Sequence, residues 1–323
     1  MKREEFLARL KRELGDIARE DTQQIEDFYE ELILDGMEQG FSEEEILEKF
    51  GSPEEVARQV RREYGGLIPY TSKMSSDTGY ESSEMVHTVL IDASNLRINV
   101  RTVENGPIRV LFHPKEGSDK VTFTEENGVF SFVHRTKGLF HLNWLNLFLD
   151  YNILILEIPR SFGGTLKLKT SNAPIRAANL TNLAAAELVS GNGKIKAENI
   201  KADSFTIRTS NSKLELVGLK GRTLEAVTNN GSVSARECSF PERTVLQTKN
   251  GSVSCRNLIS DQIQMQTCNG SVTGTIIGNV NDYAIQSSTM NGSNNLRNVP
   301  TEGKQKSLSA KTVNGQIHLE FLE

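Results

Sequence analysis

The chain has 323 residues, with 37 Lys or Arg and 42 Asp or Glu, which gives a formal net charge of −5 at neutral pH. A nucleic-acid-binding protein needs a basic surface for its phosphate contacts, so this balance argues against that class. The acidic excess lies at one end, because residues 1–64 hold 10 basic and 19 acidic side chains, whereas the remainder is net +4.

Residues 1–64 have the apolar spacing of helices, with Phe6, Leu10 and Leu14 as the first example. Ser42 with Glu45 fits a capping box, and the pattern recurs at the start of the next helix. The sequence predicts four short helices, near 2–14, 21–39, 42–50 and 53–64. Their acidic surface is either a solvated face or a docking surface for a basic protein partner.

Residues 65–84 begin with Gly-Gly and are rich in Ser and Thr, which predicts a flexible linker. No secretory signal is visible, because the chain opens directly into a charged amphipathic helix. Cys238, Cys255 and Cys268 have neither paired nor metal-binding spacing, which indicates a reducing compartment. We expect a cytoplasmic protein, with a peripheral position at the inner face of the cell membrane as the second option.

Residues 85–160 are predicted to form irregular coils that cap the end of the β-helix formed by the rest of the chain. Asn105-Gly106 and Asn127-Gly128 are flanked by alternating apolar residues, so they are expected to be corners of the same kind as those further along the chain. Large aromatic residues in this region indicate a cap, because an open end of a β stack exposes apolar surface and unpaired strand edges.

The most apolar stretch, residues 139–149, has about half of the roughly 20 residues needed to span a bilayer. It is either a part of the cap and core or a contact with a membrane surface or a protein partner. The side chains that would make such a contact are Leu139, Phe140, Trp144, Leu147 and Phe148.

Residues 161–323 repeat a unit of about 19–20 residues, centred on an asparagine that is followed in most copies by glycine. Apolar residues recur six and four positions before this asparagine and three and five after it, while Thr or Ser stands two before it. The asparagines are Asn172, Asn192, Asn211, Asn230, Asn250, Asn269, Asn291 and Asn314.

The alternation on each side of the asparagine predicts two short strands per repeat, each with one buried and one solvent-facing side. The Asn-Gly pair is expected to turn the chain through a positive φ. Isolated hairpins are the alternative, since Asn-Gly also favours hairpin turns. The identity of the rows across copies favours a parallel β-helix, in which each coil is stabilised by its neighbours.

The sequence holds no metal-binding pair, phosphate loop or nucleophile motif, so we expect neither a cofactor nor an enzyme. One basic group is a candidate for binding an anionic partner such as lipid headgroups, a cell-wall polymer or the acidic helical region itself. The alternative is that these residues keep the strand faces soluble. The group is Lys167, Lys169, Arg176, Lys194, Lys196, Arg208 and Lys213.

The stretch Leu154-Ile-Leu-Glu-Ile-Pro159 and the repeated Asn-Gly units that follow it resemble the bacterial putative-adhesin β-strand-repeat family. The motif Phe50-Gly-Ser-Pro-Glu-Glu-Val-Ala57 is similar to the HAAS-type helical signalling domain. The first resemblance implies a β-helical domain without catalytic residues that is linked to envelope stress. HAAS-type domains are commonly followed by membrane spans, which this chain replaces with the linker.

The sequence therefore predicts a small helical domain at 1–64, a linker at 65–84 and a β-helix at 85–323, of which 161–323 are regular coils. We expect a noncatalytic binding or scaffolding protein of envelope-stress signalling. The alternatives are a structural β-helix that polymerises end to end like a bactofilin, a surface adhesin and, less favoured, a carbohydrate-active enzyme.

Overall fold

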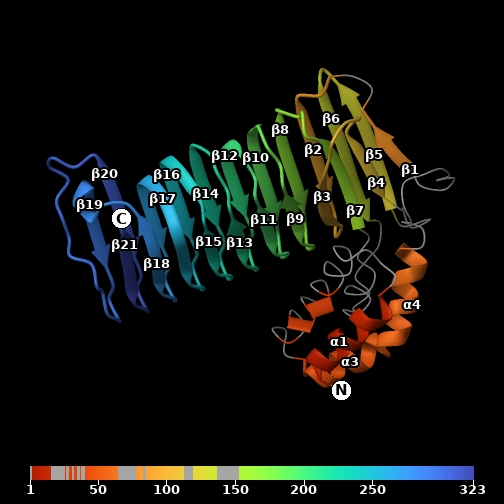
Figure 1. Ribbon diagram of the computed structural model, residues 1–323, viewed down its shortest axis with the longest axis horizontal. Coiled ribbons are helices and arrows are strands. Elements are labelled where there is room, and N and C mark those ends of the chain that lie inside the picture. The colour runs from red at the N-terminus through yellow and green to blue at the C-terminus, as the bar shows by residue number, and fades with distance from the viewer. Residues whose placement is uncertain are drawn as a thin grey trace. The chain divides into compact units, whose positions relative to one another are not determined.

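The computed structural model contains two compact units, one helical and one built of β-strands, and each is described by itself. Figure 1 follows the chain from the N-terminal helices to the C-terminal strands. The structure describes residues 2–15, 26, 29–30, 33–34, 37, 41–64, 78–82, 85–112, 119–136 and 153–323.

The helical unit contains α1 (Arg3–Glu13), α3 (Glu43–Phe50) and α4 (Pro53–Tyr64). The described residues between 21 and 39 are also helical. Phe6, Leu10 and Leu14 recur at helical spacing and are fully buried, so α1 packs through one apolar face. The Phe6 and Phe50 rings lie 5.7 Å apart and join α1 to α3.

Both predicted capping boxes are confirmed. The Ser42 hydroxyl accepts from the Glu45 N–H at 3.3 Å, and the Glu45 carboxylate accepts from the Ser42 N–H at 2.9 Å. The same exchange joins Ser52 and Glu55 at the start of α4. Each box satisfies two N–H groups that a helix leaves without an internal partner, which explains why α3 and α4 begin where they do.

The β unit is a flattened solenoid whose strands lie in two sheets (Figure 1). Sheet A contains, in spatial order, β1 (Thr78–Glu81), β4 (Arg109–Phe112), β7 (Ile153–Pro159), β3 (Arg97–Val103), β9 (Ile175–Ala178), β11 (Ile195–Glu198), β13 (Leu214–Val217), β15 (Val233–Arg236), the first part of β17 (Val253–Gln266), β18 (Val272–Ile277) and β21 (Ile317–Leu322).

Sheet B contains, in the same direction, β5 (Asp119–Glu126), β6 (Val129–Thr136), β2 (Thr88–Ala93), β8 (Thr165–Thr170), β10 (Leu183–Ser190), β12 (Ala202–Arg208), β14 (Thr223–Val227), β16 (Ser239–Gln247), the second part of β17, β20 (Lys306–Lys311) and β19 (Tyr283–Ser288). A short 3-10 helix, η1 (Val280–Asp282), precedes β19.

Each regular coil consists of one strand in each sheet. The chain runs along β10 in sheet B, turns at Asn192, runs along β11 in sheet A and returns to sheet B as β12. β10 and β12 pair in parallel with Leu188 opposite Ile207, which are residues of the same row in successive repeats. The predicted parallel β-helix of about 19–20-residue coils with two strands each is therefore confirmed.

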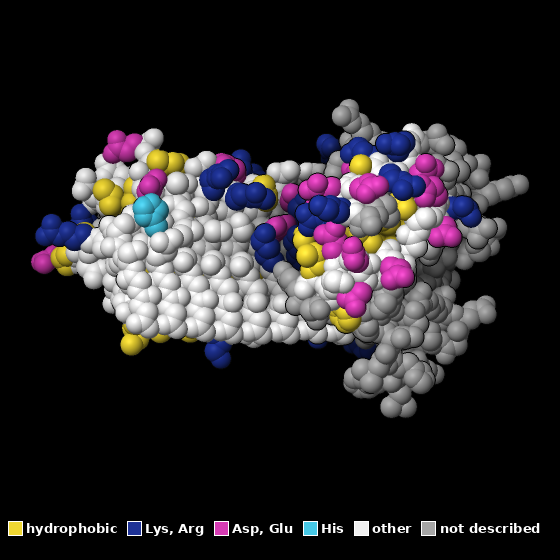
Figure 2. All heavy atoms as spheres, turned by 90° about the horizontal axis from the view of Figure 1, so that it is seen from below, with side chains coloured by type: hydrophobic (Ala, Val, Ile, Leu, Met, Phe, Trp, Pro, Cys, Tyr) yellow, Lys and Arg dark blue, Asp and Glu magenta, His cyan; other side chains and the backbone are white. Residues whose placement is uncertain are grey.

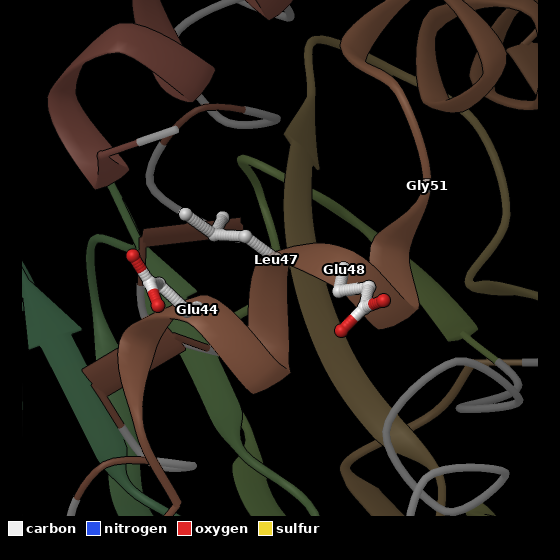
Figure 3. Close-up of a pocket in the computed structure, with 4 residues that line it drawn as sticks. All are labelled: Glu44, Leu47, Glu48 and Gly51. Carbon is white, nitrogen blue, oxygen red and sulfur yellow. The ribbon is translucent and has the colours of Figure 1, made fainter.

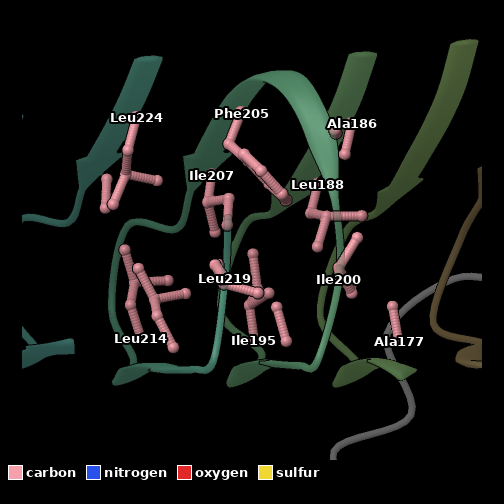
Figure 4. Packing of buried hydrophobic residues seen from close by; sticks show 14 of the residues in the cluster. Ala177, Ala186, Leu188, Ile195, Ile200, Phe205, Ile207, Leu214, Leu219 and Leu224 are labelled. Atoms are coloured by element: carbon pink, nitrogen blue, oxygen red, sulfur yellow. The ribbon is translucent and has the colours of Figure 1, made fainter. Parts of the chain in front are cut away.

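The space between the sheets is filled by the apolar rows of the repeat. Leu188, Ile195, Ile207 and Leu214 are each 0% exposed, and they meet residues of the neighbouring coils as well as of their own (Figure 4). Strand residues alternate between buried and exposed along the coils, as the period of two predicts. One continuous core runs through the solenoid from Val89 to Leu319.

The N-terminal end of the solenoid differs from the prediction in strand direction. Asn127-Gly128 is the turn of an antiparallel hairpin between β5 and β6, with φ of 51° and 70°, and is not a corner of a coil. β4 likewise runs antiparallel to β7. The hairpin alternative therefore holds here, because Asn-Gly at positive φ suits the tight turn of an antiparallel pair.

The predicted linker is too long at its C-terminal end, because β1 pairs with β4 as the outermost strand of sheet A. The Tyr80 ring on β1 lies 5.2 Å from Phe123 and 5.3 Å from Phe132. These rings cover the end of the core, as the prediction of an aromatic cap requires. Residues 65–77 lie outside the described residues.

The stacking order at both ends departs from the order of the sequence. The first coil, β2 and β3, lies between the layer of β6 and β7 and the layer of β8 and β9. At the other end β20 lies between β17 and β19, so the last coil is inserted inside the one that precedes it. Similar rows allow either order, and spacing alone does not distinguish them.

The C-terminal end carries its own cap. Val299 and Ile285 exchange two backbone hydrogen bonds of 2.9 Å, which cover part of the outer edge of β19. On sheet A the Asn295 side chain donates to the Leu319 carbonyl at 2.9 Å and accepts from its N–H at 3.0 Å, as a neighbouring strand would. These contacts occupy backbone groups that would otherwise pair with another chain.

The close stacking of the corners predicts an intolerance of side chains at the corner glycines. A Cβ at Gly251 would lie 2.2 Å from the Gly231 carbonyl oxygen, whereas one at Gly163 would lie 3.4 Å from the Asn182 oxygen. We expect Gly251→Ala to lower the free energy of unfolding by about 1–3 kcal/mol, as overpacking does. Urea denaturation measures this, and Gly163→Ala should change it by less than about 0.5 kcal/mol. Equal effects would contradict the explanation.

Candidate functional site

The asparagines of the repeat form a continuous ladder along one corner of the solenoid. Each donates from Nδ2 to Oδ1 of the asparagine in the preceding layer, as Asn230 does to Asn211 at 2.6 Å and Asn250 to Asn230 at 2.7 Å. Eight such bonds join nine asparagines in the spatial order Asn95, Asn172, Asn192, Asn211, Asn230, Asn250, Asn269, Asn314 and Asn291.

All eight predicted corner asparagines are in the ladder, but the predicted reason for their presence is wrong. They lie in the described part of the chain and none has a positive φ. Positive φ occurs instead at the opposite corner of the coils, at Asn179, Asn199, Gly218, Glu237 and Asn257, and within the ladder at its first member, Asn95. The ladder therefore needs asparagine for its amide, and the glycines that follow serve close packing between layers.

Asn95 is the ladder residue that the sequence reading missed. Val89 and Ile91 precede it by six and four positions, and Ile98 and Val100 follow it by three and five, as in the other repeats. It carries Leu96 in place of the glycine and Ala93 in place of the Thr or Ser two positions before, so the repeat pattern is weaker there. The row offsets without the glycine were the signal that could have found it.

A second row of hydrogen bonds lies beneath the ladder. The Thr or Ser two residues before each of the eight repeat asparagines donates to a corner carbonyl of the preceding layer, and all of these residues except Thr289 are buried. Thr209 donates to Gly193 at 3.0 Å, and Thr248 donates to Gly231 at 2.7 Å. The row comprises Thr170, Ser190, Thr209, Thr228, Thr248, Thr267, Thr312 and Thr289.

Outside the ladder this corner is lined by glycine and serine. The Ser252 and Ser271 N–H groups point to the serine hydroxyls of the layers before them, at 3.4 and 3.3 Å. Figure 2 shows a broad face of the solenoid that is nearly free of charged side chains. The corner thus presents uncharged hydrogen-bonding groups at a regular spacing set by the strand separation of about 4.8 Å.

The basic group predicted from the sequence is divided over the solenoid and paired with carboxylates. Lys167, Lys169 and Arg208 lie on the outer side of sheet B, and Arg176 and Lys196 on that of sheet A. The ion pairs are Lys167–Glu187, Lys169–Asp92, Lys194–Glu215, Lys196–Glu198, Arg208–Glu225 and Lys213–Glu215. Neighbouring carboxylates therefore offset much of the positive charge.

Glu215 is the centre of these pairs, because both Lys194 and Lys213 contact it, at 3.0 and 2.7 Å. Burial alone would raise the pKa of its carboxyl. The hydrogen bonds and charges of the two lysines outweigh burial and lower the pKa from 4.5 to about 2.

The helical unit carries a shallow hollow on α3 that is lined by Glu44, Leu47, Glu48 and Gly51 (Figure 3). Glu44 and Glu48 are exposed and lie one turn apart, whereas Leu47 is 4% exposed. The exposed carboxylates lie beside the buried Leu47, so the hollow presents negative charge, which suits a basic protein surface.

No group of three His, Cys, Asp or Glu side chains within the described residues is placed to hold a metal ion. Burial raises the pKa of the Cys238 thiol to about 11 and that of Cys255 to about 12, so both remain protonated at neutral pH. They fill apolar rows of the core, as predicted. The proposed contact residues Leu139, Phe140, Trp144, Leu147 and Phe148 lie outside the described residues.

The fold and the site define a β-solenoid protein with an added helical domain. Residues 86–321 match the Toastrack DUF4097 family, and residues 5–59 match the HAAS domain. Because the first match covers well over half of the sequence, the chain belongs to the Toastrack DUF4097 family. Both resemblances noted in the sequence are confirmed. No curated protein matches the chain.

Two solved structures resemble it weakly. A putative cell adhesion protein from Clostridium sporogenes ATCC 15579 is 10% identical, with a TM-score of 0.26 over 76% of this chain and 100% of that one. A putative adhesin from Bacteroides fragilis NCTC 9343 is 9% identical, with a TM-score of 0.37 over 77% of this chain and 98% of that one. At these identities and TM-scores the resemblance supports no conclusion about this chain.

No helix among the described residues is both long and apolar enough to cross a membrane.

The ladder predicts a stability cost for losing one of its amides. Asn230→Ala removes two hydrogen bonds, the one that Asn230 donates to Asn211 and the one that it accepts from Asn250. We expect a loss of about 0.5–1.5 kcal/mol in the free energy of unfolding, because the orphaned amides are exposed and can bind water. Urea denaturation measures this, with Asn229→Ala as the control for an exposed neighbour. A loss no larger than that of the control would contradict a stabilising ladder.

The lowered pKa of Glu215 predicts a specific loss of stability in acid. Its folded pKa of about 2 lies below the ordinary 4.5, so its contribution is complete above pH 4.5 and disappears as the pH falls toward 2. Glu215→Gln should lower the free energy of unfolding at pH 7 and flatten its decline between pH 4.5 and 2. Denaturation over this range tests it, with Glu225→Gln, which removes a half-exposed pair, as the weaker control.

Proposed function

We propose that this protein is a noncatalytic scaffold of bacterial envelope-stress signalling. The helical domain docks a protein partner through the hollow on α3, and the solenoid holds a long, rigid polar surface for a second ligand or partner. The observation that carries the proposal is the placement of the exposed Glu44 and Glu48 one turn apart at the hollow of a capped helix. Such a surface offers negative charge to a basic partner.

The character of the solenoid supports a scaffold over an enzyme. Its core consists of apolar side chains and of hydroxyls that bond to the neighbouring layer. Its outer ionisable residues pair in cross-strand ladders such as Arg208 with Glu225. An active site needs titratable groups with shifted pKa values that converge on a cleft. Among the described residues, Glu215 has the one carboxyl with a strongly shifted pKa, and it is held between two lysines on the surface.

Polymerisation end to end is the less favoured function. The edge groups of Leu319 and Ile285 are occupied by Asn295 and Val299. The other end is closed by an antiparallel hairpin and by aromatic rings. A filament of stacked solenoids would need these caps to be displaced.

We place the protein inside the cell, where reduced thiols are stable, with the inner face of the membrane as the site of signalling. The absence of any cysteine pair among Cys238, Cys255 and Cys268 supports this compartment.

Reversing the charge of the α3 hollow tests the docking proposal. The full chain, expressed in bacterial cells and crosslinked there with formaldehyde, should give discrete protein adducts. Glu44→Lys with Glu48→Lys should reduce them at least about tenfold, the scale of a charged contact. Glu4→Lys with Glu5→Lys, the same charge change on α1, should preserve them. Fractionation assigns the adducts to cytosol or membrane. Adducts that survive the α3 change would sink the proposal.

A further inference from the structure

The chain contains eight Asn-Gly pairs, and the structure places them in two different environments. Six belong to the ladder, at Asn192, Asn230, Asn250, Asn269, Asn291 and Asn314. The other two, Asn105-Gly106 and Asn127-Gly128, lie in the N-terminal part of the solenoid outside it.

Asn-Gly is the dipeptide in which an asparagine side chain is most easily attacked by its own backbone. The glycine nitrogen bonds to Cγ of the asparagine, the Cγ–Nδ2 bond breaks, and ammonia leaves with a succinimide ring behind. Water then opens the ring at either carbonyl to give aspartate or isoaspartate. The reaction consumes one water and releases one ammonia, and it needs no oxidant. It does need an asparagine side chain that can rotate and a backbone that can bring the glycine nitrogen to Cγ.

The ladder restrains its members, of which the terminal Asn291 is held in the ladder through Nδ2 alone and has its Gly292 closely packed against the Gly315 oxygen. Asn192 donates Nδ2 to Asn172 and accepts at Oδ1 from Asn211, so its amide is held on both sides. The Gly193 nitrogen, which would have to attack, donates to the buried Ser190 hydroxyl at 2.8 Å. A Cβ on Gly193 would lie 1.9 Å from the Ala173 oxygen, a measure of how closely the layers enclose this backbone.

Asn105 has neither restraint. It lies in the turn between β3 and β4, is exposed, and makes no hydrogen bond within the part of the chain that the structure describes. Gly106 has a φ of 124°, and a Cβ placed on it would meet no atom within 4 Å. The nearest fixed contact is the exposed ion pair between Glu104 and Arg160 at 3.1 Å.

The second pair outside the ladder, Asn127-Gly128, is an intermediate case. The Asn127 carbonyl faces His87 Nε2 at 3.0 Å. A Cβ on Gly128 would lie 2.5 Å from the His87 ring, and the Gly128 oxygen accepts from the His87 N–H at 2.9 Å. The hairpin backbone is thereby held in place even though the Asn127 side chain is exposed.

We propose that Asn105 is the site of spontaneous deamidation in this protein and that the asparagine ladder protects its six Asn-Gly pairs against the same reaction. Conversion places a new carboxylate beside Glu104, which pairs with Arg160. The turn between β3 and β4 therefore accumulates negative charge as the protein ages, while the corner of the solenoid does not.

Peptide mass spectrometry of the folded full chain, incubated at neutral to mildly alkaline pH, tests the proposal. The peptide with Asn105 should convert to the aspartate and isoaspartate forms at least about tenfold faster than any ladder peptide, because ladder residues react only from locally opened states. In denaturant all eight pairs should react at similar rates. Ladder peptides that convert as fast as Asn105 in the folded protein would overturn the proposal.

Two variants isolate the causes. Asn211→Ala removes the acceptor of Asn230 and should accelerate conversion at Asn230 while Asn269, two layers further along, stays slow. Asn105→Gln should abolish the first acidic species seen by isoelectric focusing, and circular dichroism confirms that the fold is kept. An unchanged rate at Asn230 in the first variant would show that the ladder amides are not the protecting element.

Discussion

The solenoid depends on contact between successive coils. A single coil orders about 19 residues while burying only a few apolar side chains, and the conformational entropy lost exceeds what that burial returns. Each layer is therefore stable only against a neighbour that carries the same rows. Leu188 on Ile207 and Ile195 on Leu214 are examples of this dependence, which repeats along the whole core.

The polar groups at the corner follow the same rule. Buried Thr209 bonds to Gly193 of the preceding layer, and Asn211 bonds to Asn192, so neither finds its partner within its own coil. All the amides of the ladder point the same way, from the C-terminal layers toward Asn95. Aligned hydrogen bonds polarise one another, which makes the corner a cooperative element.

Much of this architecture could be predicted from the sequence, because rows repeat with local spacing. The apolar rows, the capping boxes at Ser42 and Ser52 and the corner position of the asparagines were all accessible in that way. The antiparallel pairing at Asn127 was not, since Asn-Gly suits both a coil corner and a hairpin. The double ion pair of Glu215 could not be predicted either. Lys213 is its neighbour in the sequence, but Lys194 comes from the adjacent coil and reaches the same carboxylate only because the coils stack.

The insertion of the last coil has a consequence for the order of events during synthesis. When β19 emerges, the edge of β17 is open, and β19 carries Ile285 in the row position that Leu308 occupies in β20. The finished structure requires β20 to take that edge and β19 to lie outside it. Any early pairing of β19 with β17 must therefore be given up before the strands reach their final order. A strand made later then separates two strands that were made before it.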